Sequence, residues 1–226
     1  AYSGFSYWSI LIGRLTGAII GTIYIIIAMP WKFSFHFNYN IFKRLLGFGK
    51  WILFTSIIFT FVSTIDTFII GKKLSLVELG FYAIAARWGY LVLLQLTPAL
   101  QKVLFPIFSS SNNVSEIKES YLYSLYFLGI ISFPISFGMV SVAPEFIDVI
   151  SGDKWSSAII PLQILSICGL IRSLNLADPI YISQNRPNYS FYIMMFMFIY
   201  LLLFLYPSIS YGGIIGASLC ITFGYF

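Results

Sequence analysis

Six runs of predominantly apolar residues, each about 20 residues long, constrain this chain more than any other feature of its sequence. A helix needs about 20 such residues to cross the hydrocarbon core of a bilayer. The runs cover residues 8–29, 51–70, 81–108, 121–142, 158–177 and 189–206, and a further run begins at Gly213. We therefore expect an all-α integral membrane protein, a polytopic helical bundle of six complete transmembrane helices plus a truncated seventh.

The segments between the runs carry turn-forming and charged residues, which indicates that they leave the membrane. Residues 109–113 (SSSNN) and 151–154 (SGDK) are examples, and their polar groups could not be satisfied in hydrocarbon. The runs lack the two-residue alternation that the strands of a membrane barrel show, so the sequence favours helices. Only 9% of the residues are charged, against roughly 25% in a soluble domain, and this excludes a water-soluble fold.

Lysine and arginine collect in the cytoplasmic loops of membrane proteins, and they orient this bundle. Residues 30–50 carry four basic residues and no acidic one, whereas residues 145–154 carry three acidic residues and one lysine. We therefore expect residues 30–50 to be cytoplasmic. Within this segment Ile41, Leu45 and Phe48 recur at helical spacing, which suggests a short amphipathic helix on the inner leaflet. A solvated linker is the alternative.

Charged residues inside the apolar runs are the candidates for function, because each costs about 2.5 to 3.5 kcal/mol to insert at the centre of a bilayer. Arg14, Asp66, Arg87 and Arg172 lie in four different runs, and Lys102 lies toward the inner end of the third. Three arginines on three helices suggest a cationic cavity, and a guanidinium pairs well with phosphate oxygens. The alternative is that some of these arginines extend their side chains to the lipid headgroups.

Helical spacing places small and polar residues beside these charges. A glycine recurs every four residues on the face that carries Arg14: Gly13, Gly17 and Gly21. This stripe predicts that Arg14 points into the bundle.

Hydroxyl side chains recur every three or four positions beside Asp66: Ser56, Thr60, Ser63 and Thr67. Polar residues and a helix-kinking proline follow Arg87 along one side of the third run: Gln95, Pro98, Gln101 and Lys102. A water-filled groove would satisfy these groups, and interhelical hydrogen bonds are the alternative.

The chain lacks the common sequence patterns of nucleotide hydrolysis, metal binding and covalent catalysis. It has no Gly-x-x-x-x-Gly-Lys phosphate loop and no Asp-x-Asp pair. With one histidine and two cysteines, it also lacks the Ser/His or Cys/His groups of a covalent catalyst. We therefore expect a transporter of an anionic solute rather than an enzyme, with no metal or other cofactor and no nucleic-acid partner.

Five stretches in the first half of the chain resemble polysaccharide flippases of the Wzx type, which belong to the multidrug/oligosaccharidyl-lipid/polysaccharide (MOP) exporter superfamily. They are residues 4–14 (GFSYWSILIGR), 45–49 (LLGFG), 65–71 (IDTFIIG), 79–85 (LGFYAIA) and 104–109 (LFPIFS). The likeness continues more weakly at residues 152–155 (GDKW) and 185–187 (NRP). It implies a protein of two six-helix lobes that flips undecaprenyl-diphosphate-linked oligosaccharide repeat units across the bacterial cytoplasmic membrane by alternating access.

Set against that two-lobe plan, residues 1–29 correspond to the last transmembrane helix of the N-lobe. Residues 30–50 correspond to a basic cytoplasmic interlobe loop, and residues 51–226 to the helices of an incomplete C-lobe. Because the chain starts at Ala1 rather than Met, we interpret it as a fragment. The resemblance implies a role in O-antigen, capsule or exopolysaccharide biosynthesis, with the lipid-linked oligosaccharide, membrane lipids and other polysaccharide-assembly proteins as partners.

Two other functions remain open. A multidrug or small-molecule exporter of the same superfamily would bind organic cations and should favour interior acids over arginines. An integral-membrane glycosyl polymerase is the less favoured alternative, since it usually carries a long loop outside the membrane, and no loop here exceeds about 20 residues.

The resulting hypothesis for the site assigns the diphosphate or sugar to Arg14, Arg87, Arg172 and Gln95, with the hydroxyl stripe as a polar lining. Asp66 has two interpretations. It responds to a proton or sodium ion during transport, or it forms an interior ion pair with Arg87.

Overall fold

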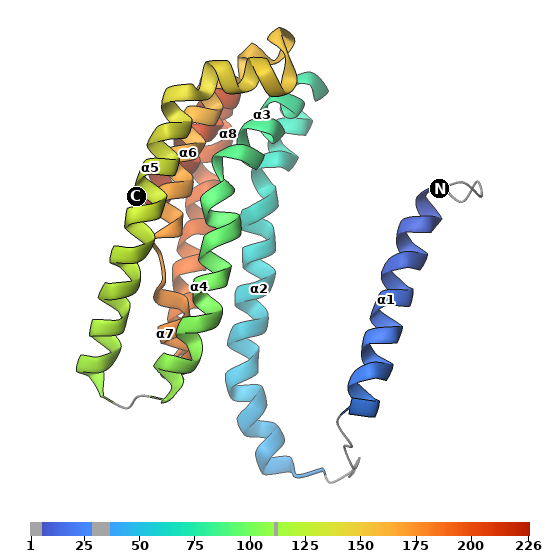
Figure 1. Ribbon diagram of the computed structural model, residues 1–226, viewed down its shortest axis with the longest axis vertical. Helices are drawn as coiled ribbons and strands as arrows, with labels where there is room; N and C mark the ends of the chain where they lie inside the picture. The colour runs from blue at the N-terminus through green and yellow to red at the C-terminus, as the bar shows by residue number, and fades with distance from the viewer. Residues whose placement is uncertain (1–5, 29–36, 111–112) are drawn as a thin grey trace. The chain divides into compact units, whose positions relative to one another are not determined.

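A computed structural model describes residues 6–28, 37–110 and 113–226, and every regular element in these ranges is helical (Figure 1). The chain divides into two units, Ala1–Lys43 and Arg44–Phe226. The first unit holds α1 (Ser6–Ala28) and the first residues of α2 (Tyr39–Lys73). The second unit holds the rest of α2 and all later helices, and it contains the site described below.

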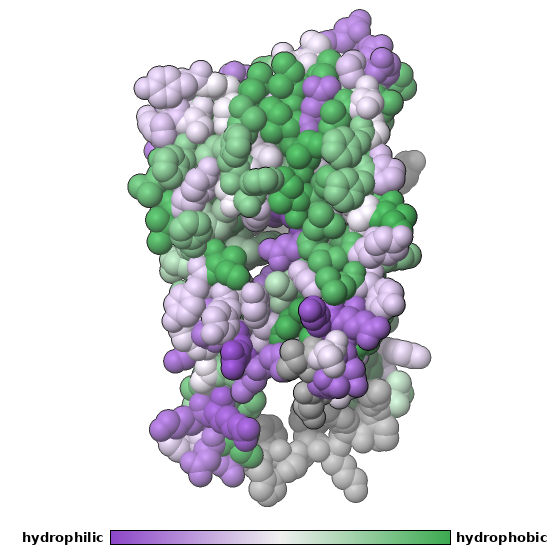
Figure 2. Space-filling view, turned by 90° about the vertical axis from the view of Figure 1, so that its left-hand side faces the viewer, coloured by the Kyte–Doolittle hydropathy of each residue, from purple (hydrophilic) through white to green (hydrophobic). Residues whose placement is uncertain are grey.

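The second unit is an antiparallel bundle whose helices reverse direction at its two ends (Figure 1). After α2 come α3 (Leu76–Gly89), α4 (Leu91–Ser110), α5 (Val114–Ser151) and the short 3-10 helix η1 (Asp153–Ala158). The chain then forms α6 (Ile159–Ser173), α7 (Ala177–Ser183) and α8 (Pro187–Tyr225). Apolar side chains dominate the face over α5, and hydrophilic side chains gather at its lower end (Figure 2).

Helix α6 lies at the centre of this bundle, in contact with α3, α4, α5 and α8. Gly169 lets α6 approach α3 closely, because a Cβ added at Gly169 would collide with the carbonyl oxygen of Gly89 at the end of α3. A Cβ added at Gly89 would in turn lie 2.8 Å from the Cβ of Leu165. The end of α3 and the middle of α6 therefore touch backbone to backbone, which small residues permit.

The described ranges do not support the expected count of six complete spans plus a truncated seventh. Four helices of the described ranges are long and apolar enough to cross a membrane, or up to five spans if α3 and α4 form one bent span. These two helices are bent by 43° at the break, which the continuous apolar run 81–108 did not reveal. Within α1, residues Ile12–Ala28 form a shorter apolar helix.

Helix α8 is two helices that meet at Gly213, where the sequence predicted a new span. Gly213 has φ 56° and ψ −138°, a conformation that only glycine adopts readily. The second part folds back along the first. A hydrogen bond joins the two parts, since the hydroxyl of Tyr200 donates to the carbonyl of Cys220 at 3.2 Å. A Cβ added at Gly216 would likewise collide with the carbonyl of Ser208. The two apolar runs are separate helices, as expected, and the turn between them is made at Gly213.

Residues 30–50 were expected to form a loop with a short surface helix. Residues 30–36 lie outside the described ranges, and residues 39–50 are the first turns of α2, which continues into the apolar run 51–70. At the other end of α2, Ser75 starts α3 with a capping box. The Glu78 backbone N–H donates to Ser75 Oγ at 3.2 Å, and the Ser75 N–H donates to Glu78 Oε2 at 3.1 Å.

We expect Gly169→Ala to lower the thermal unfolding midpoint of the full-length protein in detergent, because the added methyl group forces the α3 and α6 backbones apart. Overpacking of this kind costs about 1 to 3 kcal/mol. Gly138→Ala on α5 is the matched control, since no atom lies within 4 Å of a Cβ built there. Equal midpoints for the two variants would show that the close approach is not needed for stability.

Candidate functional site

Two adjoining cavities are lined by α4 and by the segment formed by α6 and α7, and α2 and α8 also line the first. The first, of about 290 Å³, is lined by Arg172, by other polar side chains (Thr97, Gln101, Asn175 and Asp178) and by apolar or aromatic ones: Phe59, Leu94, Pro98, Met194 and Tyr225. The second, of about 530 Å³, is lined by Lys102 and by mostly apolar side chains: Phe105, Pro106, Pro179 and Ile182. We name them the Arg172 cavity and the Lys102 cavity. Both include Pro98, Gln101 and Asp178, so they form one continuous α4–α7 groove.

Arg172 lies in the last turn of α6, and aromatic rings from two other places in the fold hold its guanidinium. Its Cζ atom is 5.0 Å from the ring centroid of Tyr90, at the break between α3 and α4. It is 4.4 Å from the ring centroid of Tyr225, near the end of α8. Both distances are within the range of cation–π attraction. The half-buried guanidinium thus has a defined position while it lines the cavity.

A buried hydroxyl group without a hydrogen-bond partner lines the same cavity as Arg172. It belongs to Thr97, which is 5% exposed. An unsatisfied buried polar group costs about 1 to 3 kcal/mol. Pro98 adds a further acceptor, because it has no N–H to donate to the carbonyl of Leu94 one turn earlier. These groups are available to a ligand.

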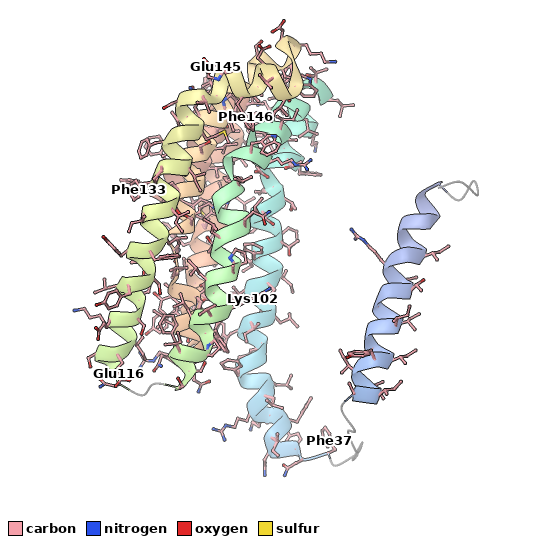
Figure 3. The ribbon with its side chains drawn as sticks, in the orientation of Figure 1. Phe37, Lys102, Glu116, Phe133, Glu145 and Phe146 are labelled. Atoms are coloured by element: carbon pink, nitrogen blue, oxygen red, sulfur yellow. The ribbon has the colours of Figure 1, made fainter. Side chains whose placement is uncertain are left out.

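The charges of the groove come from different helices. Lys102 lies on the lower half of α4 in Figure 3, where its side chain is exposed. Arg172 is on α6 and Asp178 is in the first turn of α7. Two cations and one carboxylate give this groove a formal charge of +1 inside a bundle that is otherwise apolar.

Of the four residues predicted to bind substrate, only Arg172 lines the groove. Arg87 is exposed on α3, with its Cζ atom 6.0 Å from the ring of its neighbour Trp88. Gln95 is exposed on α4 and lines neither cavity. Arg14 is on α1, which belongs to the first unit.

The predicted hydroxyl stripe is exposed on α2, and none of its residues lines the groove, although Phe59 of the same helix does. Ser56, Thr60 and Ser63 each donate to a backbone carbonyl three or four residues earlier, at 2.9, 2.9 and 3.0 Å. The Thr67 hydroxyl donates to Asp66 Oδ1 at 3.2 Å. These hydroxyls are therefore satisfied within their own helix, and such bonds allow them to face lipid.

Asp66 joins α2 to α3 through a tyrosine. The hydroxyl of Tyr82, which is 1% exposed, donates to Asp66 Oδ2 at 2.6 Å. Asp66 and Arg87 are both described, and no ion pair joins them. Tyr82 was not predicted as a site residue, because in the sequence it lies within an apolar run. The signal was its position, since Asp66 and Tyr82 lie at similar distances before and after the turn at residues 73–75 and so face each other in a helical hairpin.

These features define a helical, multi-pass membrane protein with a polar, cationic groove, and the comparisons identify its family. The model of the polysaccharide biosynthesis protein family matches residues 1–160. The chain therefore belongs to this family, which confirms the resemblance to Wzx-type flippases. With its bacterial relatives and its apolar helices, it is a multi-pass protein of the bacterial cytoplasmic membrane.

Three curated relatives illustrate the similarity. The teichuronic acid biosynthesis protein TuaB of Bacillus subtilis is 30% identical over 72% of this chain and 34% of its own length. The lipopolysaccharide biosynthesis protein WzxC of Escherichia coli is 29% identical over 84% of this chain and 38% of its own length. A putative O-antigen transporter of Shigella flexneri is 30% identical over 44% of this chain and 24% of its own length.

The chain thus spans about a third of the length of the first two of these relatives. No solved structure matches it. The names of the relatives describe polysaccharide biosynthesis proteins and a transporter, and an enzyme is not among them.

We expect Tyr82→Phe to lower the thermal unfolding midpoint, because it removes a hydrogen bond to a charged group, which contributes about 1.5 to 3 kcal/mol. Tyr192→Phe is the control, since Tyr192 is 55% exposed and its ring contacts with Trp51 and Phe191 are kept. The melting curves of both variants can be followed by tryptophan fluorescence in detergent. A midpoint for Tyr82→Phe equal to that of the control would contradict the role of this link.

Proposed function

We propose that the full-length protein flips undecaprenyl-diphosphate-linked oligosaccharides across the cytoplasmic membrane, and that the α4–α7 groove receives the diphosphate. The observation that carries this proposal is the groove itself, which is lined by Arg172, Lys102 and the unpartnered hydroxyl of Thr97. Membership of the polysaccharide biosynthesis protein family supports the class of substrate. The names of the three relatives, which refer to teichuronic acid, lipopolysaccharide and O-antigen, support it further.

The chemistry of the groove suits a diphosphate. A guanidinium donates two parallel hydrogen bonds to phosphate oxygens, and an ammonium acts as a compact point charge. Arg172 supplies the first kind of group and Lys102 the second. A drug exporter would instead favour acidic groups, and this groove holds two cations against one carboxylate.

The proposed direction of transport is outward, because the groove lies toward the end of the bundle that we expect to be cytoplasmic. Lys102 and α7 lie toward the end where α4 passes into α5 and where α8 starts (Figures 1 and 3). Lys118 and Arg186 lie near this same end, at the starts of α5 and α8, as expected for the inner side. In an alternating-access cycle, the substrate would enter the groove from this side.

We expect Arg172→Gln to reduce polysaccharide export by about tenfold or more, because a charge-assisted hydrogen bond contributes about 1.5 to 3 kcal/mol. Arg172→Lys should recover part of the loss, since it keeps the charge but not the planar fork. The measurement is surface polysaccharide in a deletion strain that produces each full-length variant at the wild-type level.

Arg87→Gln is the matched control, because Arg87 is an exposed arginine outside the groove. Normal export by both Arg172 variants would remove Arg172 from the proposed site. If Arg87→Gln lost as much export as Arg172→Gln, the diphosphate site would have to include Arg87, as the sequence predicted.

We further propose that Asp66 responds to a proton or sodium ion during the cycle. Asp66→Asn should then permit binding of the lipid-linked saccharide but block its turnover, because the side chain can no longer change its charge. Flipping of a fluorescent lipid-linked saccharide in proteoliposomes with imposed pH or sodium gradients measures this effect. If the flipping rate did not change with either gradient, and Asp66→Asn were as active as the wild type, the coupling role would be contradicted. The role of Asp66 would then be structural, through its hydrogen bond to Tyr82.

A further inference from the structure

The two cavities of the α4–α7 groove differ in their chemistry. Besides Lys102, Gln101 and Asp178, the Lys102 cavity is lined by apolar side chains from α4 and α7: Pro98, Phe105, Pro106, Pro179 and Ile182. A phosphate attached to an apolar chain would satisfy both kinds of surface, since lysine binds phosphate as a point charge and the apolar walls cover hydrocarbon.

The Arg172 cavity contains more hydrogen-bonding groups than a phosphate alone could pair with. Asp178 and Gln101 line both cavities, whereas Thr97 and Asn175 line the Arg172 cavity and not the Lys102 cavity. Asp178 can only accept hydrogen bonds when ionised, and the amides of Gln101 and Asn175 both donate and accept. A phosphate diester presents only acceptor oxygens, so the acceptors of this cavity would be left without partners. Sugar hydroxyls donate and accept, and they match this set.

One unpartnered hydroxyl, one carbonyl that lacks its helical donor and the size of the cavity also fit a sugar. The buried hydroxyl of Thr97 has no partner, and Pro98 leaves the carbonyl of Leu94 without its helical donor. The volume of about 290 Å³ is at the lower end of the roughly 300 to 1,000 Å³ typical of small-molecule sites. That space suits one sugar ring rather than a chain of sugars.

We propose that the Arg172 cavity is the subsite for the first sugar of the lipid-linked saccharide. Arg172 binds the phosphate next to this sugar, and Lys102 binds the phosphate next to the lipid. Thr97 and Asn175 bind sugar hydroxyls. This assignment rests on the proposed function and adds to it the order in which the substrate lies along the groove.

The test compares two probes that differ only in the saccharide, bound to the full-length protein in lipid nanodiscs. One is undecaprenyl diphosphate without a sugar, and the other is the saccharide-bearing lipid extracted from a strain that lacks the gene. Thr97→Val and Asn175→Ala should each weaken binding of the saccharide-bearing lipid by about fivefold, the effect of one neutral hydrogen bond. They should leave the affinity for undecaprenyl diphosphate unchanged. Lys102→Gln should weaken binding of both probes equally.

The control for the threonine substitution is Thr64→Val, because the Thr64 hydroxyl is exposed and donates to the carbonyl of Thr60 in its own helix. It should bind both probes as the wild type does. Asn175 is exposed at the surface of the groove, so Asn175→Ala gives an answer even if Thr97→Val does not fold.

Three results would overturn the subsite. The Thr97 and Asn175 variants could bind both probes like the wild type, they could lose affinity for both probes alike, or the wild type could bind both probes equally well. A wild-type protein that binds neither probe would overturn the proposed function itself, together with this inference.

Discussion

The direct contact between the backbones of α3 and α6 determines where the other parts of the site lie. Gly169 approaches the carbonyl of Gly89 so closely that neither position has room for a side chain. Because Gly89 is the last residue of α3, this contact also locates the break before α4. It brings Tyr90 over the guanidinium of Arg172, one turn after Gly169 on α6.

Apolar length and turn chemistry predicted the helical architecture well, but they did not predict where the helices break. The apolar runs are largely helical, because a hydrocarbon environment leaves the backbone no other local way to satisfy its hydrogen bonds, yet the run 81–108 is divided between α3 and α4, and the run 158–177 between α6 and α7. Hydropathy averages over a window, however, and does not register a bend such as that at Tyr90 or a one-residue turn such as Gly213. Those features depend on packing between segments that are distant in the sequence.

The candidate site could be predicted in kind but not residue by residue. The sequence showed that arginines lie in the apolar runs, and Arg172 does line a polar groove. It did not show that Arg87 is exposed, because the packed face of a helix depends on its neighbours and not on its own spacing. Lys102 and Asp178 reach the groove because α4 and α7 pack together. No pattern within one segment contains that information.

The pair of tyrosine rings around Arg172 has a consequence for how fast and how tightly an anion can bind. An arginine side chain loses about 2 kcal/mol of rotamer freedom when it is immobilised. The rings of Tyr90 and Tyr225 restrict the guanidinium before any ligand arrives, so part of this entropy is already lost in the folded protein. Pre-organisation of this kind raises affinity without adding a contact. Tyr90, which does not line the groove, therefore acts on the residence time of the ligand through Arg172 alone.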